Sequence, residues 1–402
     1  MKAWWITWLV LLAAGPATAD DMPRLSGSLA AVAAQADDTL QERKSALGAS
    51  GRLSLEAQAS PALALKLQAE HASNSELGVI SSGPWLREAR ARYSQEAFDL
   101  TAGRQLLISG KTDLIALQDQ FMPRDLTQQG MSDTEQRLGL PALRLDVYAG
   151  EAWTLTSALV QQDRSYILPA RIRNAMPAWK TLQDEPAQGG LARLGYRHGI
   201  WEWEAGASWG ATPLPALSLG PGGPSVHFPQ ERRLFADGTL TLDSGVLRWD
   251  LVRAMVQTEN SPGLPDGHWA FALGWDQGLW PDANLTGQWI YRRDSLPGTP
   301  QPMLAQAAAA NQALAQAFEP IQQWLSASLK QRLGDEHELE AILLAGSARQ
   351  RGTIARWTWR MSDGWTLGAR LQVLHGQERS LLASLTPARQ FYLELRRHFD
   401  WK

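Results

Sequence analysis

Charged residues of both signs crowd the stretch between positions 105 and 141, where they could act on ions. Glycine and proline lie between the charges and favour corners that would hold them in place. Fixed positive and negative groups across a narrow aqueous space would impose a transverse field on whatever passes. The stretch therefore predicts a constriction, with candidate residues Lys111, Asp113, Arg124, Asp125, Glu135 and Arg137. A solvated external loop whose charges pair with each other is the alternative interpretation.

Arginine also recurs at alternate positions of extended, otherwise apolar stretches. Such alternation places the arginines on one face of a strand, which in a membrane-spanning barrel is the inner face. We predict that a set of basic residues faces the lumen: Arg90, Arg92, Arg144, Arg193, Arg197, Arg248, Arg356, Arg360 and Arg370. Acidic residues share this face, so the basic excess is slight. Because a guanidinium binds a carboxylate through two hydrogen bonds, these arginines could instead tie neighbouring strands together.

Residues for catalysis or metal binding are missing or do not lie in a recognisable spacing. The sequence has no cysteine, and none of its 7 histidines lies in a motif such as His-Glu-x-x-His. We therefore expect no metal, no other cofactor and no enzymatic activity. A hydrolase built on a barrel wall is an alternative, but it would need a nucleophile, a base and an orienting group.

A period of two predicts the elements that must position these residues. Between positions 47 and 59, leucine, alanine and glycine fill the odd positions, and mostly polar residues fill the even ones. The same period recurs up to the end, where Phe391, Leu393 and Leu395 share a face. No apolar run after position 19 reaches about 18 residues, so strands and not helices must cross a membrane. A soluble β-sandwich also alternates, but its strands are shorter, about 5 to 6 residues. The pattern predicts an all-β protein, a transmembrane antiparallel up-and-down β-barrel.

Connections between these stretches are short and long in strict alternation. Short turns are expected near 60–61, 95–97, 149–152, 199, 243–245, 277–283, 334–336 and 362–364. Longer connections are expected near 35–45, 72–84, 105–141, 161–189, 211–232, 257–267, 294–322, 348–351 and 376–388. Outer-membrane barrels have short periplasmic turns and long external loops, and this alternation predicts about 18 strands, with 16 as the alternative count.

Two of the longer connections have patterns of their own. Residues 302–319 are rich in alanine and glutamine and are followed by Pro320, which predicts one short loop helix. This helix could cap the pore or lie outside it. The proline-rich stretch 211–224 predicts a rigid loop.

Tryptophan is unusually frequent, with 19 residues in the chain. Tryptophan is enriched where a membrane protein meets the lipid headgroups, so this frequency favours aromatic girdles around a barrel. The candidate belt residues are Trp201, Trp203, Trp209, Trp269, Trp275, Trp357, Trp359 and Trp401.

The first residues read as a secretory signal. Lys2 is followed by an apolar stretch, and Ala17, Thr18 and Ala19 form a small-x-small cleavage site. We expect a signal peptide over 1–19. Because no linker or change of composition divides the rest, we expect a single barrel domain over 20–402.

One segment of about an eighth of the chain carries a family resemblance. A strand ending in Gly-Arg-Gln is followed by a Gly-Lys-x-Asp loop, then Pro-Arg-Asp, and then a return strand; these motifs lie at 103–105, 110–113, 123–125 and 141–144. Over residues 98–148 the chain resembles porin-like and alginate-export-like bacterial outer-membrane β-barrels. The resemblance implies an outer-membrane location, and alginate-export barrels would have an arginine-rich lumen for an acidic polysaccharide.

These observations predict an outer-membrane protein of a Gram-negative envelope. We expect a porin-like channel or exporter that passes small hydrophilic or anionic solutes. Its expected partners are outer-membrane lipid, the barrel-assembly machinery and the solute. The formal net charge of -3 gives no sign of nucleic-acid binding. A non-conducting barrel that serves a secretion or efflux system, through a periplasmic partner, is the alternative.

Overall fold

The computed structural model describes most of the chain between positions 23 and 401. The described ranges are 23–37, 43–72, 83–111, 117–118, 121–125, 136–167, 187–220, 223–258, 261–295, 305–314, 320–347, 349–362, 364–376 and 389–401. The signal peptide expected over 1–19 lies outside them.

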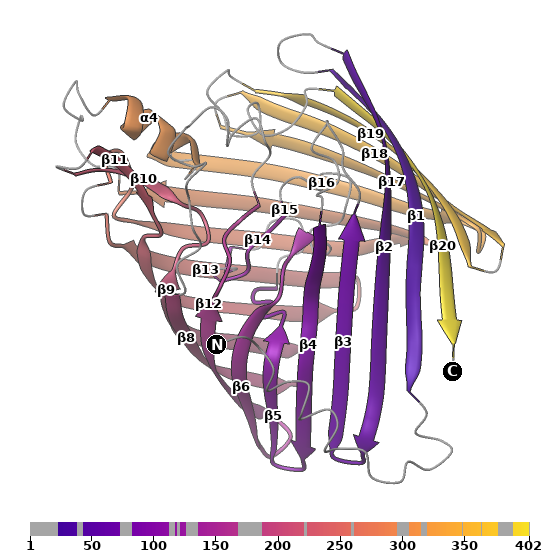
Figure 1. The fold of residues 1–402 in the computed structure, drawn as a ribbon, viewed down its shortest axis with the longest axis horizontal. Coiled ribbons are helices and arrows are strands. Elements are labelled where there is room, and N and C mark those ends of the chain that lie inside the picture. Colours follow the sequence, from indigo (N-terminus) through magenta and orange to yellow (C-terminus); the bar gives the residue numbers. More distant parts are fainter. Residues whose placement is uncertain are drawn as a thin grey trace.

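Eighteen strands of the described residues form one antiparallel sheet. They are β1 Arg24–Asp37, β2 Arg43–Ser60, β3 Leu63–Ala72, β4 Gly83–Gln95, β5 Phe98–Gln105, β6 Leu140–Ala149, β7 Trp153–Gln162, β8 Ala187–His198, β9 Trp201–Ala211, β12 Gln230–Leu242, β13 Gly245–Val256, β14 Gly267–Trp280, β15 Ala283–Asp294, β16 Ile321–Leu333, β17 His337–Gly346, β18 Gln350–Ser362, β19 Trp365–His375 and β20 Arg389–Trp401. Each strand pairs with the next in the chain, and β1 also pairs with β20, so the sheet closes into a barrel (Figure 1). The prediction of about 18 strands in an up-and-down barrel is confirmed.

The alternation in the sequence corresponds to two environments in the structure. On β19, Leu371 is 51% exposed, whereas its neighbours Arg370 and Gln372 are 8% and 2% exposed. On β12 and β13, Asp237 and Asp250 are fully buried on the inner side. Large apolar side chains therefore cover the outside of the sheet, and polar ones are enclosed. This arrangement of apolar and polar side chains is the reverse of that in a soluble protein, and it is typical of a barrel surrounded by lipid.

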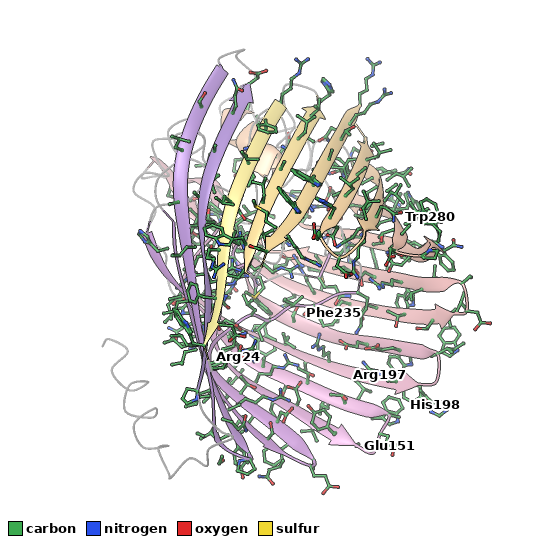
Figure 2. All side chains as sticks on the ribbon, turned by 90° about the vertical axis from the view of Figure 1, so that its right-hand side faces the viewer. Arg24, Glu151, Arg197, His198, Phe235 and Trp280 are labelled. Carbon is green, nitrogen blue, oxygen red and sulfur yellow. The ribbon has the colours of Figure 1, made fainter. Side chains whose placement is uncertain are left out.

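Short turns and longer connections alternate around the barrel as expected. Figure 2 shows Glu151, His198 and Trp280 along the rim that the short turns form. The turn expected at 277–283 is narrower than predicted, because β14 continues to Trp280 through an irregularity between Gly278 and Trp280. The connection expected at 348–351 is also shorter, since β17 ends at Gly346 and β18 begins at Gln350.

Three further elements lie together at the long-loop end (Figure 1). The helix α4 (Ala305–Leu314) falls within the predicted range 302–319. The stretch 211–224 was predicted as a rigid loop, and this was wrong in part, because β10 (Ala216–Gly220) pairs with β11 (Gly223–His227). The buried Asn311 side chain joins α4 to this hairpin: its Oδ1 accepts from the Leu217 N–H at 2.8 Å and its Nδ2 donates to the Leu217 carbonyl at 2.9 Å. None of the described helices is long and apolar enough to span a membrane.

The sidedness of β19 generates a direct test. We expect Leu371→Lys to impair membrane insertion, because a cation on the lipid face near the midplane costs about 2–4 kcal/mol. The readout is the fraction of protein that folds into vesicles, measured by heat-modifiable electrophoretic mobility.

The matched control is Gly368→Lys on the same strand. Gly368 faces the lumen side opposite Glu394, and a Cβ added there meets open space. This variant should insert normally. Normal insertion of Leu371→Lys together with failure of Gly368→Lys would mean that the two faces are exchanged.

Candidate constriction and lumen

The segment that follows β5 turns into the barrel and packs on its inner wall. Leu107, Phe121 and Met122 are buried against inward residues of the barrel wall, namely Leu140, Ala158, Val160 and Leu191. The Leu107 N–H points to Met122 Sδ at 3.1 Å. An apolar patch inside a barrel would otherwise face water, so covering it keeps the segment inside.

The Phe121 ring packs against two glycines of the barrel wall. A Cβ at Gly189 on β8 would lie 2.9 Å from the ring, and one at Gly210 on β9 would lie 2.7 Å from it. Both distances are too short for a real contact. The ring can therefore approach this wall only because neither strand has a side chain there.

A second anchor lies farther around the barrel. Leu117 packs against Phe235, Val252 and Ala270, which are inward residues of β12, β13 and β14. The Leu117 carbonyl also accepts a hydrogen bond from Arg233 Nη1 at 3.1 Å. The segment thus leaves β5 and reaches strands that follow more than 100 residues later in the chain.

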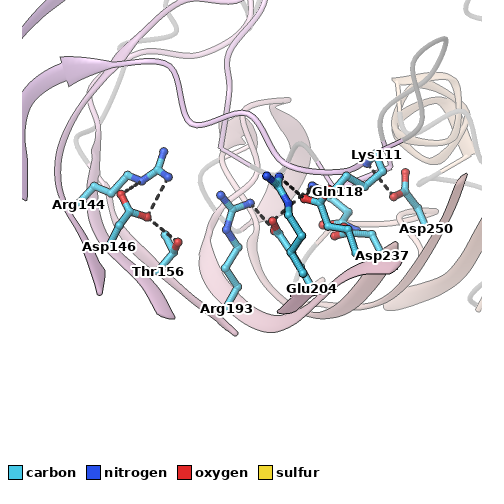
Figure 3. Close-up of polar contacts among 11 residues, drawn as sticks. Lys111, Gln118, Arg144, Asp146, Thr156, Arg193, Glu204, Asp237 and Asp250 are labelled. Carbon is cyan, nitrogen blue, oxygen red and sulfur yellow. Dashed lines mark hydrogen bonds and ion pairs between the residues drawn. The ribbon is translucent and has the colours of Figure 1, made fainter. Parts of the chain in front are cut away.

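Between these anchors the segment meets four carboxylates, which we call the acidic wall: Glu202 and Glu204 of β9, Asp237 of β12 and Asp250 of β13. Lys111 Nζ lies 2.7 Å from Glu202 Oε1 and 3.5 Å from Glu204 Oε1. The Lys111 N–H donates to Asp250 Oδ1 at 3.0 Å. Gln118 Nε2 donates to Asp237 Oδ2 at 2.9 Å (Figure 3).

Local backbone and charge both favour this contact. Gly110 has a φ of 95°, a conformation that costs glycine little, and lies directly against Asp250. Burial by itself would lower the pKa of Lys111, but the hydrogen bond to Glu202 and the charge of Glu204 outweigh it. The pKa of Lys111 is therefore raised, and the ammonium stays charged.

Three other predicted constriction residues, Arg124, Asp125 and Arg137, lie in a separate group. Asp125 and Arg137 are buried, and the Asp125 N–H donates to the Gln136 carbonyl at 2.8 Å. Arg124 forms an isolated β-bridge with Arg137, and its carbonyl accepts from the Ile167 N–H at 2.9 Å. Asp113 and Glu135 lie outside the described residues.

Most of the predicted lumen arginines lie beside a carboxylate. Partners on an adjacent strand are Asp99 for Arg92, Glu204 for Arg193, Glu202 for Arg197, Asp276 for Arg248 and Glu340 for Arg356. Arg90 and Arg144 pair with Glu88 and Asp146 on their own strands. Arg360 donates to the Asp335 carbonyl in a short turn at 3.3 Å, and Arg370 hydrogen-bonds Gln372. The five pairs between adjacent strands tie those strands together, whereas the contacts of Arg90, Arg144 and Arg370 lie within one strand.

A groove runs along the inner side of the last three strands. Its volume is about 260 Å³, and its polar lining includes Arg356 of β18, Arg370 of β19, and Tyr392 and Arg396 of β20. Arg396 Nε lies 2.7 Å from Glu394 Oε1. The groove therefore holds three guanidinium groups on one part of the wall, with the Glu394 carboxylate among them.

The predicted belt tryptophans lie at two levels of the strands. Trp201, Trp203, Trp275, Trp357, Trp359 and Trp401 are near the short-turn end, and Trp209 and Trp269 are near the long-loop end. Trp203 is in a ring cluster with Trp153 and Tyr196, with centroids 5.7 and 5.9 Å away. Trp357 and Trp359 stack on each other at 6.2 Å.

The sequence analysis placed acidic residues on the inner face but did not connect them with the predicted constriction. The period of two places the acidic wall residues on the inner face, but nothing in the local sequence pairs them with Lys111. Leu117 and Phe121 were an available signal, because they are apolar residues in a segment otherwise read only for its charges. Among the described residues, no group of three or more histidine, aspartate or glutamate side chains could hold a metal ion.

Comparison with solved structures identifies the same architecture. OccK3 (OpdO) of Pseudomonas aeruginosa matches with a TM-score of 0.57 and 12% identity, covering 94% of this chain and 96% of its own. OccAB2 of Acinetobacter baumannii matches with a TM-score of 0.57 and 8% identity, covering 94% and 98%. OmpT, an outer membrane protein of Vibrio cholerae, matches at 0.51 and 12%, covering 94% and 99%. No protein-family model and no curated protein sequence matches the chain.

The closed sheet, its apolar exterior and these structural neighbours define the class. The chain is a closed 18-stranded β-barrel with an apolar exterior, the fold of these outer-membrane proteins. At these identities the likeness concerns the fold.

The packing of the inward segment generates a second prediction. We expect Phe121→Ala to loosen the segment, because truncating a buried phenylalanine typically costs about 3–5 kcal/mol. Hydrogen exchange at the Leu107 amide, which points to Met122, should become faster while the barrel strands stay protected. The control is Leu159→Ala, which removes an outward side chain of β7 that is 61% exposed. Equal exchange in both variants would show that Phe121 does not hold the segment.

Proposed function

We propose that this protein is an outer-membrane channel that passes small hydrophilic solutes, with a preference for anions. The observation that carries the proposal is the unequal distribution of charged groups around the lumen wall. An inward segment covers one wall and neutralises part of its negative charge, while the strands opposite hold a groove lined by arginines. A solute would pass between them.

The positions of the two walls support this reading. β20 lies opposite β9 in the ring, with β1 to β8 on one side and β12 to β19 on the other. The acidic wall begins on β9, and the basic groove ends on β20. The two walls thus face each other directly at β9 and β20, where groups of opposite sign would impose a transverse field on a solute in the lumen.

Export of an acidic polysaccharide is a narrower form of the same proposal. It would need guanidinium groups that can exchange their present carboxylate partners for those of the polymer. Arg356 and Arg396 now pair with Glu340 and Glu394, each on the same or the adjacent strand. Current block by oligomers of an acidic sugar, but not of a neutral one, would favour this form.

Conductance of the purified, refolded protein in a planar bilayer tests the proposal. We expect stepwise currents and a reversal potential in a salt gradient that shows anion preference. A folded barrel that inserts but passes no current would contradict the proposal and favour a non-conducting barrel with a periplasmic partner.

Charge reversal in the lumen is the corresponding mutational test. In Arg356→Glu/Arg360→Glu, we expect a several-fold shift of the permeability ratio toward cations, because two fixed positive charges become negative. Assembly should be preserved, since both side chains face away from lipid.

The matched control is Arg351→Glu, which reverses an exposed charge on the outward face of the same strand. Its permeability ratio should equal that of the unmodified protein. A shift of the same size in Arg351→Glu would mean that the ratio does not report on the lumen.

A further inference from the structure

The acidic wall is an unfavourable arrangement of like charges. In the sheet register Glu204 stands directly opposite Asp237, and Asp237 stands directly opposite Asp250. Like charges in directly opposite positions destabilise neighbouring strands. Asp237 and Asp250 are also fully buried, so water does little to reduce their repulsion. A nearby positive charge would stabilise a row of this kind.

Part of the counter-charge comes from the neighbouring strand β8 of the barrel. Arg193 Nη1 lies 3.0 Å from Glu204 Oε2, and Arg197 Nη2 lies 3.2 Å from Glu202 Oε1. Both arginines are on β8, on the side of β9 away from Asp237 and Asp250. They therefore neutralise charge only at the β9 end of the acidic wall.

The inward segment supplies the rest. Lys111 contacts Glu202 and Glu204 through its ammonium and Asp250 through its backbone N–H. Gln118 contacts Asp237 but carries no charge. Among the described residues of this segment between β5 and position 118, Lys111 is the only cation.

We propose that Lys111 sets the ion preference of the lumen by neutralising the acidic wall. The ammonium is brought to the acidic wall by a segment that lies 91 positions before Glu202 in the chain. The counter-charge that β8 does not supply therefore depends on one side chain. With Lys111 in place, the arginines of the opposite groove dominate what a passing ion meets. Without it, uncompensated carboxylates attract cations. This inference rests on the proposed channel function.

The test is the cation-to-anion permeability ratio of Lys111→Gln in a planar bilayer. We expect the ratio to rise about tenfold, because one unit charge acting through water at about 6 Å changes the local concentrations of a monovalent cation and a monovalent anion about threefold each, in opposite directions. Lys111→Arg keeps the charge and should restore the original ratio. Lys111→Gln combined with Glu202→Gln removes one charge of each sign and should also return the ratio to its original value.

Each outcome decides between the two proposals. An unmodified protein that conducts, with no change of ratio in Lys111→Gln, overturns the role of Lys111 and leaves the channel intact. An unmodified protein that passes no current overturns both. An equal rise in Lys111→Arg and Lys111→Gln overturns the inference as well, because altered packing and not charge would be responsible.

A measurement on the unmodified protein covers the case in which Lys111→Gln does not fold. Lys111 has 23% of its side chain exposed, against 45% for Lys330, which pairs with Glu338 at 2.8 Å. We expect a water-soluble amine-acylating reagent to modify Lys330 several-fold faster than Lys111, as followed by mass spectrometry. Equal rates would show that Lys111 is not held at the acidic wall.

Discussion

A bilayer interior offers no water to backbone N–H and C=O groups, so each strand of a spanning sheet needs a hydrogen-bonded neighbour on both sides. Here the pairing of β1 with β20, from Leu25 opposite Trp401 to Asp37 opposite Arg389, meets that need for the first and last strands. Closure fixes which side of every strand faces outward. The outer rows of leucine, alanine and tryptophan and the inner rows of charged residues then follow from the period of two.

Closure also creates an interior, and the segment after β5 folds into it. A wide lumen brings like charges together on its curved wall, as in the row of Glu204, Asp237 and Asp250. It also leaves apolar inner patches, such as that around Val160, which water would cover at a cost. The segment after β5 stabilises both features: Phe121 covers the apolar patch, and Lys111 contacts the acidic wall. Packing and electrostatics therefore hold the segment in the same place.

Much of this fold could be predicted from the sequence, and the site only in part. The period of two is local, so the face of Leu371 or Arg370 can be read from immediate neighbours. The hairpin of β10 and β11 was missed because the prolines of the stretch 211–224 predicted a loop, whereas its stability comes partly from Asn311 of α4. The contact of Lys111 with Glu202 joins residues 91 positions apart. Such a contact depends on closure and has no local signature.

The sidedness of the strands is the central claim, and cysteine accessibility tests it most directly. The chain has no cysteine, so single substitutions along β19 give one reactive site each. In vesicles, a charged water-soluble thiol reagent should modify cysteines at positions 366, 368 and 370 and spare those at 367, 369 and 371. Modification of the second set with protection of the first would place the leucine rows inside, and both the membrane barrel and the channel would be wrong.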